Sequence, residues 1–311
     1  MSYKISVIIP TYNIIKENSK NTFDRTINSL KKQSIGFENL EIIIVDDNSN
    51  QESKDFLEKL DKEHENIKVI FLLENNGSPS KPRNVGIKNS TTDYIMFLDQ
   101  DDTFTQKSCE VMYNTINNKH ADIVSSNYII KMNNNKYVAF HENPLYKEFN
   151  PNHSLNKFQK QYAPWARIFR KSLLDKLKLP DKILLEDSYM NFNAFIKSQK
   201  VIYLNDFFSY QYTVNEESIT LNSKKSTIIK GLDGIREIIL VLNKYPDNIP
   251  LVIDDLFSMV LQTLLMFNFS ISENKKILKM FKELEEEIIT DSRYIYIMKI
   301  KSCLNQFGLN F

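Results

Sequence analysis

Hydrophobic and polar positions follow two alternating patterns over the first 130 residues. Short apolar runs rich in β-branched residues predict strands at Ile5–Ile9, Glu41–Val45, Lys68–Leu73, Tyr94–Leu98 and Asp122–Ser126. Segments between them carry apolar residues at helical spacing and predict helices at Phe23–Gln33, Ser53–Lys62, Arg83–Asn89 and Gln106–Asn118. Continuous apolar strands separated by helices are typical of a parallel sheet covered on both faces. We therefore expect a doubly wound α/β unit in this part of the chain.

The rest of the chain shows other patterns. Residues 131–225 contain Asn-rich loops, an aromatic-rich stretch and two strand-like runs, Val201–Leu204 and Phe207–Tyr212. From Ser226 onward there is no strand pattern, and helical spacing predicts about four helices, at Ile228–Leu242, Leu251–Phe269, Ile277–Ile289 and Tyr294–Leu304. We expect a helical appendage over 226–311. Its uncharged stretch Leu256–Phe269 favours a packing or homo-oligomerisation module.

Composition narrows the class of protein. The chain has 311 residues, of which 42% are hydrophobic and 25% charged, which is enough for a substantial core. A formal net charge of +1 gives no reason to expect binding to nucleic acid. Cys109 and Cys303 are too few and too distant for a disulfide framework, and the four histidines form no metal-ligand motif. No apolar run has the length of a signal peptide or a membrane span, so we expect a cytoplasmic protein.

Polar clusters follow four of the predicted strands. In chain order they are Pro10–Asn13, Asp46–Ser49, Asn75–Ser78 leading to Lys81–Asn84, and Asp99–Asp102. Ligands of an open parallel sheet bind beyond the carboxyl ends of its strands, so we expect these clusters to share one edge. Five aspartates at one edge would repel one another. A bound cation and a polyhydroxylated ligand would supply a reason for them.

Asp99 and Asp101 form an acidic pair separated by Gln100. Alternate side chains diverge at a strand end, so one carboxylate can reach a ribose hydroxyl while the other reaches a metal ion. Mg²⁺ and Mn²⁺ prefer oxygen ligands and often share them with substrate phosphates. The triplet alone is a weak motif. Its place after the apolar run Tyr94–Leu98 and beside the other clusters makes it a strong one.

Asp47 and Arg83 each have a structural and a functional interpretation. Asp47 falls where a helix N-cap is expected, although Asn48 or Ser49 would serve equally well, and it can instead accept a hydrogen bond from the imide N–H of uracil. Lys81 and Arg83 lie just before a predicted helix, where cations oppose the macrodipole. A solvated pair is the structural interpretation, and for Arg83 we favour binding of a base or phosphate.

Glu186 and Asp187 come before an aromatic-bearing helical run, Tyr189–Phe195. An acidic pair at a helix start often acts only as a cap that complements the dipole. A carboxylate at this position can also act as general base for an incoming hydroxyl.

These motifs, in this order, resemble those of the inverting family 2 glycosyltransferases of the GT-A fold. The matching segments are Ser6–Asn13, Ile44–Ser49, Arg83–Gly86, Phe97–Asp102, Pro164–Trp165, Ile168–Arg170 and Leu185–Asp187. The resemblance covers residues 1–220. It implies a GT-A catalytic domain over 1–225, with a nucleotide-sugar-binding half at 1–130 and an acceptor-binding half at 131–225.

The resemblance also implies roles for the matching residues. The base of a UDP-sugar would lie against Pro10, Thr11, Tyr12 and Asp47. Arg83 would also contact the nucleotide, Asp99 the ribose, and Asp101 a Mn²⁺ or Mg²⁺ ion on the diphosphate. Asp187 would be the general base of a single inverting displacement.

Four further residues complete the expected donor site. Asn76 and Gln100 belong to the strand-end clusters, and Ser218 and Thr220 lie in a loop expected to contact the diphosphate. Many relatives have a His shortly before this Ser-x-Thr, and here none precedes it. The missing imidazole leaves the metal shell incomplete.

The loop Asn76–Asn84 is similar to that of bacterial wall teichoic acid glycosyltransferases, which transfer GlcNAc to poly(ribitol phosphate) and in some cases form trimers. It implies a polyanionic glycopolymer acceptor and a groove lined by basic residues: Lys157, Lys160, Arg167, Arg170 and Lys171. For the homo-oligomer expected from Leu256–Phe269, the resemblance implies a trimer. It also implies GlcNAc as the sugar, and we expect transfer at the inner face of the membrane.

Three alternatives stay open at this point. The first is a glycosyltransferase of capsule or other polysaccharide synthesis. The second is a nucleotidyltransferase, against which the absence of a Gly-rich, Lys-bearing loop after the first strand counts. The third is a non-catalytic carbohydrate-binding protein on the same fold.

Overall fold

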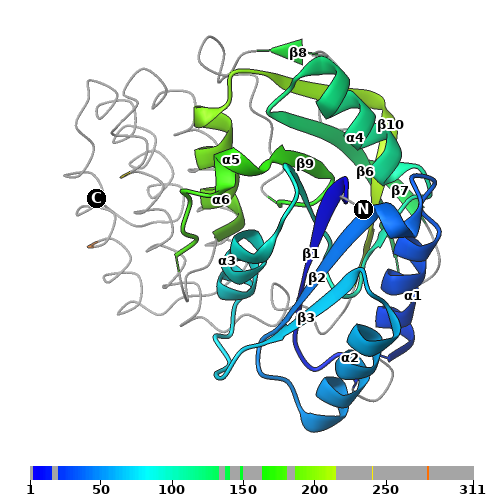
Figure 1. The fold of residues 1–311 in the computed structure, drawn as a ribbon. Coiled ribbons are helices and arrows are strands. Elements are labelled where there is room, and N and C mark those ends of the chain that lie inside the picture. The colour runs from blue at the N-terminus through cyan, green and yellow to red at the C-terminus, as the bar shows by residue number, and fades with distance from the viewer. Residues whose placement is uncertain are drawn as a thin grey trace, which may run out of the picture.

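A ten-stranded mixed sheet forms the centre of the described part of the protein (Figure 1). The computed structural model describes residues 3–15, 20–132, 137–140, 148–149, 163–180 and 186–214, with the single residues 240 and 279. The strand order is β3-β2-β1-β4-β9-β6-β10-β5, with β7 paired to β6 and β8 to β10. The expected helical appendage, 226–311, lies outside the described residues except for those two single positions.

The strands are β1 Ile5–Thr11, β2 Leu40–Asp46, β3 Ile67–Phe71, β4 Tyr94–Phe97, β5 Thr103–Phe104, β6 Ile123–Lys131, β7 Tyr137–Phe140, β8 Glu148–Phe149, β9 Arg167–Arg170 and β10 Val201–Thr213. The helices are α1 Lys20–Lys31, the 3-10 turn η1 Phe37–Asn39, α2 Gln51–Glu63, α3 Ser80–Asn89, α4 Ser108–Lys119, α5 Lys171–Leu174 and α6 Glu186–Lys197. None of the described helices has the length and apolar character needed to cross a membrane.

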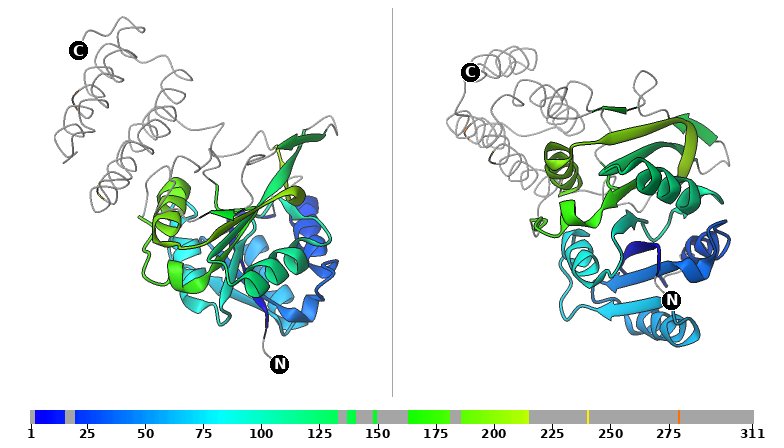
Figure 2. Two further views of the ribbon diagram at one scale, coloured as in Figure 1. Left: turned by 90° about the horizontal axis from the view of Figure 1, so that it is seen from above. Right: turned by 45° about the horizontal axis from the view of Figure 1, so that its top comes forward.

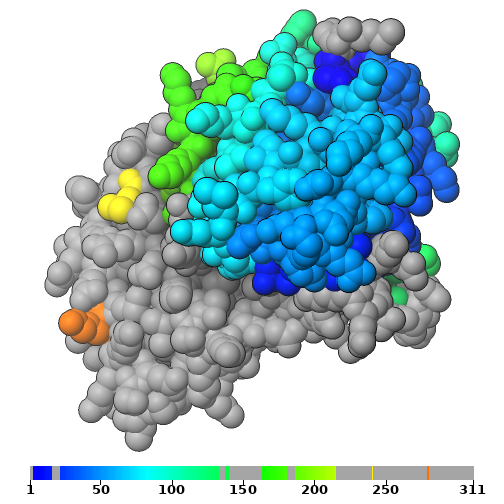
Figure 3. All heavy atoms as spheres, turned by 60° about the horizontal axis from the view of Figure 1, so that its bottom comes forward, coloured from blue at the N-terminus to red at the C-terminus, as the bar shows by residue number. Residues whose placement is uncertain are grey.

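The parallel half of the sheet confirms the prediction. Strands β1 to β4 are parallel, with Ile8 paired to Ile43 on one side and to Phe97 on the other. All residues of β1 and β2 are buried, which explains why these strands read as continuous apolar runs. In the space-filling view, the blue and cyan atoms of this half form one continuous face (Figure 3).

The other half of the sheet differs from the prediction in two ways. The short strand β9 runs antiparallel between β4 and β6, so the predicted fifth parallel strand is not adjacent to the fourth. The two runs predicted at 201–204 and 207–212 form one strand, β10, which pairs in parallel with β6. Its register shifts between Leu204 and Tyr210, and this irregularity produces the apparent break in the sequence pattern.

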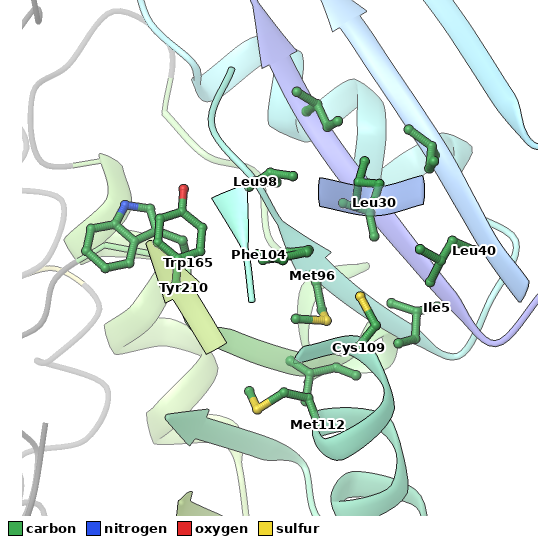
Figure 4. Close-up of a cluster of buried hydrophobic side chains, with 14 of the residues drawn as sticks. Ile5, Leu30, Leu40, Met96, Leu98, Phe104, Cys109, Met112, Trp165 and Tyr210 are labelled. Atoms are coloured by element: carbon green, nitrogen blue, oxygen red, sulfur yellow. The ribbon is translucent and has the colours of Figure 1, made fainter. Parts of the chain in front are cut away.

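Helices cover both faces of the sheet (Figure 2). Core residues of α1, α2 and α4 pack with one another and with the β1 side chains that point to the same face, those of Ile5, Val7 and Ile9. Figure 4 shows part of this core, including Leu30 of α1 and Met112 of α4. Helix α3 covers the opposite face and packs on β1 and β2.

Gly86 sets how closely α3 approaches β1. A Cβ at this position would lie 2.4 Å from Cγ2 of the fully buried Ile8. We predict that Gly86→Ala lowers the free energy of unfolding by about 1–3 kcal/mol, because α3 must move away from the sheet. Urea denaturation checks this, with Lys88→Ala on the exposed side of the same helix as the control. A Gly86→Ala variant as stable as wild type would contradict the close packing.

Candidate active site

The ends of β1, β2 and β4 meet at one edge of the sheet, as the sequence predicted. The Asp47 N–H donates to the Thr11 carbonyl at 2.8 Å, which joins the segments that follow β1 and β2. The Gln100 side-chain amide accepts from the Tyr12 N–H at 2.8 Å and donates to the Tyr12 carbonyl at 3.3 Å. Gln100 therefore holds the segment Pro10–Tyr12 beside the Asp99–Asp101 triplet. Tyr12 is exposed there, with 45% of its surface accessible.

The loop after β3 is fixed on Asp47. The Asp47 carboxylate is almost fully buried and accepts from the backbone N–H groups of Asn76 and Gly77, at 3.0 and 3.2 Å, and from the Asn76 side chain at 2.9 Å. Gly77 has a φ of 68°, a left-handed conformation that suits glycine. Asp47 thus places Asn76 at the same edge. The Asn76 N–H lies within hydrogen-bond distance of both carboxylate oxygens, at 3.1 and 3.0 Å, so three donors share the two oxygens of Asp47.

Arg83 gathers three carboxylates. It is buried, with 2% of its side chain exposed, and its Nη1 donates to Asp187 Oδ1 while Nη2 donates to Asp99 Oδ1 at 3.1 Å. Glu186 Oε1 lies 3.6 Å from Nη1. Asp99 follows β4, and the other two acids begin α6. The guanidinium therefore joins Asp99 and Asp187, which come 16 and 104 positions after Arg83 in the chain. The side chains of Asp99 and Asp187 stay 29% and 30% exposed, which leaves both within reach of a ligand.

Arg83 lies in the first turn of α3, where its positive charge opposes the helix dipole. The helix begins at Ser80, so Lys81, Pro82 and Arg83 lie inside its first turn and not before it. Proline is tolerated there because the first N–H groups of a helix have no intrahelical partner. The three carboxylates around Arg83 provide the compensation that the sequence left unexplained.

Burial and charge act in opposite directions on the acids around Arg83. Burial raises the pKa of Glu186, and the neighbouring Asp187 adds to this, so that the pKa reaches about 8 although Arg83 lowers it. Burial also raises the pKa of Asp187, while Arg83 lowers it, with a net value of about 6. Asp187 is therefore more basic than an ordinary aspartate, while the Arg83 guanidinium favours its ionised form. This combination suits a general base.

Two of the five clustered aspartates have structural roles, which corrects the argument that the acidic edge requires a ligand. Asp46 is fully buried and accepts from the N–H and the hydroxyl of Ser49. Asp102 is 1% exposed and accepts at 2.7 Å from the Tyr210 hydroxyl and at 2.7 Å from the Thr213 N–H. Hydrogen-bond donors of the protein, not a bound ion, explain these two.

The N-cap expected for α2 lies one or two residues further along. Asn50 caps the helix, with its side-chain oxygen accepting from the Ser53 N–H at 2.9 Å. Neither Asn48 nor Ser49 is the cap, since Ser49 is bonded to Asp46. Asp47 does not cap the helix either, and its carboxylate accepts from Asn76 instead.

Asp101 lies in the turn between Asp99 and Asp102 and is partly exposed. Among the described residues, no group of three or more His, Cys, Asp or Glu side chains is arranged to hold a metal ion. The donor set nevertheless fits Mg²⁺ or Mn²⁺, which are bound through one or two carboxylates and complete their shell with substrate phosphates and water. Asp101 is the residue that would hold such an ion.

The basic residues suggested for an acceptor groove do not gather at this edge. Arg170 pairs with Tyr94 at the start of β4 and bonds to Asp122 at 3.2 Å, which places it at the opposite edge of the sheet because β9 is antiparallel to β4. Lys171 follows it and pairs with Asp175. Arg167 is 1% exposed and packs over the Phe195 ring, so it cannot line an open groove. The other two groove candidates, Lys157 and Lys160, lie outside the described residues, as do the diphosphate candidates Ser218 and Thr220.

Sequence reasoning missed Tyr210. Its hydroxyl accepts from the Asp99 N–H at 3.2 Å and donates to Asp102, while its ring stacks on Trp165 at 4.6 Å. The alternation of Tyr210 and Tyr212 in a strand-like run indicated a shared face. It did not indicate contact with a turn 111 positions earlier in the chain.

Comparison with known proteins adds independent information. The poly(ribitol-phosphate) beta-glucosyltransferase of Bacillus spizizenii is 33% identical over 69% of this chain and 33% of its own length. The poly(ribitol-phosphate) beta-N-acetylglucosaminyltransferase TarP of Staphylococcus aureus is 29% identical over 78% of this chain and 73% of its own length. The chain spans about a third of the length of the first of these relatives.

Solved structures and a family profile agree with that result. The crystal structure of S. aureus TarS 1-349 in complex with UDP-GlcNAc superposes with a TM-score of 0.77 at 23% identity, over 93% of this chain and 82% of the other. This likeness shows the GT-A-like fold. The profile of "Glycosyl transferase family 2" matches residues 6–178, more than half of the sequence. The chain therefore belongs to glycosyl transferase family 2.

Proposed function

We propose that this protein transfers a sugar from a UDP-sugar to a hydroxyl of a cell-surface glycopolymer of the poly(ribitol phosphate) type, with inversion at the anomeric carbon. The observation that carries the proposal is the Arg83 ion-pair cluster, which holds Asp187 beside Asp99 at the carboxyl edge of the sheet. A candidate base thus lies next to a candidate donor ligand, and both stay partly exposed. The poly(ribitol-phosphate) glycosyltransferases among the relatives support the polymer, and the UDP-GlcNAc complex of TarS supports the donor and GlcNAc as the sugar.

Donor binding is assigned to the edge formed by the segments after β1, β2, β3 and β4. Pro10, Thr11 and Tyr12 would lie against the base, and Asp47 would accept from its imide while holding Asn76. Asp99 would bind the ribose, with Gln100 fixing the two segments to each other. Arg83 would lie close to the nucleotide, and Ser218 and Thr220 would contact the diphosphate.

The chemical step needs one proton acceptor and one displacement. Asp187 would take the proton of the acceptor hydroxyl. At the same time the hydroxyl oxygen would bond to the anomeric carbon, and the bond from that carbon to the UDP oxygen would break. Mn²⁺ or Mg²⁺ held by Asp101 would supply Lewis-acid stabilisation of the departing diphosphate. Homo-oligomerisation through residues 226–311, location in the cytoplasm and association with the inner membrane face stay predictions.

Release of UDP from a panel of UDP-sugars tests the proposal. With poly(ribitol phosphate) as acceptor, we expect one donor to be consumed in the presence of Mn²⁺ and little turnover in its absence. Asp101→Ala should lower the rate by about 10²–10³-fold, because stabilisation of the leaving diphosphate is worth several kcal/mol. Asp55→Ala, an exposed aspartate on α2, is the matched control.

Each failure has a distinct meaning in this experiment. If no donor is consumed and UDP does not bind, the proposed function is wrong. If pyrophosphate is released in place of UDP, the protein is a nucleotidyltransferase. If UDP binds but no donor turns over with any polysaccharide, a carbohydrate-binding role gains support.

A further inference from the structure

The turn that carries Asp99 and Asp101 is tied to the end of β10 by a buried hydrogen-bond relay. The Asp99 N–H donates to the Tyr210 hydroxyl oxygen at 3.2 Å, and that hydroxyl donates to Asp102 Oδ2 at 2.7 Å. The other oxygen of Asp102 accepts from the Thr213 N–H at 2.7 Å. The turn is closed by the Asp102 N–H, which donates to the Asp99 carbonyl at 3.2 Å. Two residues of the turn, Asp99 and Asp102, are thus fixed by two residues of one strand, Tyr210 and Thr213.

The Tyr210 ring is held as firmly as its hydroxyl. It is fully buried and stacks on Trp165 with 9° between the ring planes, and Phe104 meets its other side edge-on at 5.9 Å (Figure 4). A phenol clamped in this way has little freedom to follow a moving turn. The relay therefore transmits the position of β10 to the turn.

Charge gives the turn a reason to need this restraint. Asp99, Asp101 and Asp102 place three carboxyl groups within four residues, and the ionised ones push one another apart at this range. Asp102 is drawn inward by two protein donors, while Asp99 is drawn toward Arg83 at 3.1 Å. The two carboxylates point to different partners, and the residue between them, Asp101, is left partly exposed.

We propose that Tyr210 and Asp102 are positioning residues for donor binding, which set the placement of Asp99 and Asp101 by fixing their turn to the end of β10. This inference rests on the proposed function, since it assumes that Asp99 and Asp101 bind a nucleotide and its cation. Both side chains are buried, so we expect neither to touch the donor. Their removal acts only through the two aspartates of the turn.

Calorimetric titration of UDP into the full-length chain with Mn²⁺ tests the proposal. Tyr210→Phe keeps the stacked ring and removes only the hydroxyl, and Asp102→Asn keeps the shape of the side chain but satisfies one donor fewer. We expect each variant to raise the Kd for UDP about tenfold, the effect of losing one hydrogen bond to a charged group. The Mn²⁺ concentration needed for half-maximal UDP binding should rise as well, and saturating Mn²⁺ should recover most of the affinity.

Tyr94→Phe is the matched control. Tyr94 is a buried tyrosine of the same sheet whose hydroxyl donates to Asn117 at 3.3 Å, at the start of β4 and so at the opposite edge from the turn. It should lose stability in the same way as Tyr210→Phe and bind UDP and Mn²⁺ as wild type does. A purely structural role for Tyr210 would make the two variants alike in UDP binding.

A double-variant cycle completes the test. Because Tyr210 and Asp102 are bonded to each other in one relay, the double variant should lose less UDP affinity than the sum of the two single losses. Wild-type affinity in both single variants, or fully additive effects, would overturn the inference while leaving the proposed function intact. A wild-type chain that binds no UDP would overturn both. If Tyr210→Phe does not fold, the comparison of Asp102→Asn with Tyr94→Phe decides.

Discussion

Replacing Asp187 with Asn should lower the turnover number by about 10²–10⁴-fold and leave the affinity for UDP nearly unchanged. Asparagine keeps the shape of the side chain and one oxygen that accepts from Arg83, but it cannot take a proton from an acceptor hydroxyl. The raised pKa of about 6 supports this role, because burial makes Asp187 a stronger base while Arg83 favours its ionised form. Initial rates of UDP release at saturating donor and acceptor, with UDP titration alongside, measure the two quantities.

Asp175→Asn provides the control for this substitution. Asp175 forms an ion pair with Lys171 at 3.0 Å, with 45% of its side chain exposed. It caps α5, which follows the end of β9 that pairs with the start of β4. Its loss should leave turnover at the wild-type level. Normal turnover in Asp187→Asn would remove the general base from the proposed mechanism and favour a carbohydrate-binding role. A large loss of UDP affinity would instead make Asp187 part of the donor site.

The sequence pattern was sufficient to predict the parallel half of the fold because both faces of its strands are buried. Residues of β1 and β2 are apolar almost without interruption, and the helices between them have regular apolar spacing. Parallel strands place their carboxyl ends together, so the meeting of Pro10–Tyr12, Asp47 and Asp99 followed from the strand assignments alone. Local sequence patterns were therefore sufficient to predict both the parallel half of the sheet and the edge at which the candidate site lies.

The partners of individual aspartates depended on contacts that no local pattern records. Asp46 and Asp102 resemble Asp47 and Asp99 in the sequence, yet each of their carboxylate oxygens accepts from a hydrogen-bond donor of the protein. For Asp102 those donors lie 108 and 111 positions away, on β10. The tertiary fold therefore decides which aspartates have a structural role and which stay exposed.

Strand β9 was missed for a related reason. It has only four residues, Arg167–Arg170, and its charged ends conceal two buried apolar positions, Ile168 and Phe169. It lies between β4 and β6 and runs antiparallel to both, so Arg170 at its end lies at the edge opposite the site. For Arg167 and Arg170 the expectation of a basic groove was wrong, because Arg167 is buried and the direction of β9 places Arg170 at the far edge.

Arg83→Gln should have the largest effect on stability, with a loss of about 3 kcal/mol at pH 7. This is the lower end of the range for removing one partner of a buried ion pair, because Asp99 and Asp187 are each about a third exposed and Glu186 can take up a proton. Arg83 lowers the pKa of both Glu186 and Asp187, so its removal raises both. Chemical denaturation at pH 5, 7 and 8 measures the loss.

The sign of the pH dependence follows from proton binding. Carboxyl groups with raised pKa values bind more protons in the folded state than in the unfolded state, so the free energy of unfolding falls as pH rises. The deficit of Arg83→Gln relative to wild type should therefore be largest at pH 8 and smallest at pH 5. Arg170→Gln is the control, since Arg170 also bonds a carboxylate, that of Asp122, but at the far edge of the sheet. An Arg83→Gln variant with the wild-type slope against pH would contradict the cluster.

Arg83→Lys separates the charge of the guanidinium from its geometry. A lysine ammonium restores one positive charge, so it should recover most of the stability at pH 8. It is a compact point charge, however, and cannot donate to Asp187 and Asp99 from two nitrogens held in one plane, as Arg83 does. We expect UDP release by Arg83→Lys to stay at least tenfold below wild type, because Asp187 is then no longer fixed beside Asp99. Wild-type turnover in this variant would show that charge alone assembles the site.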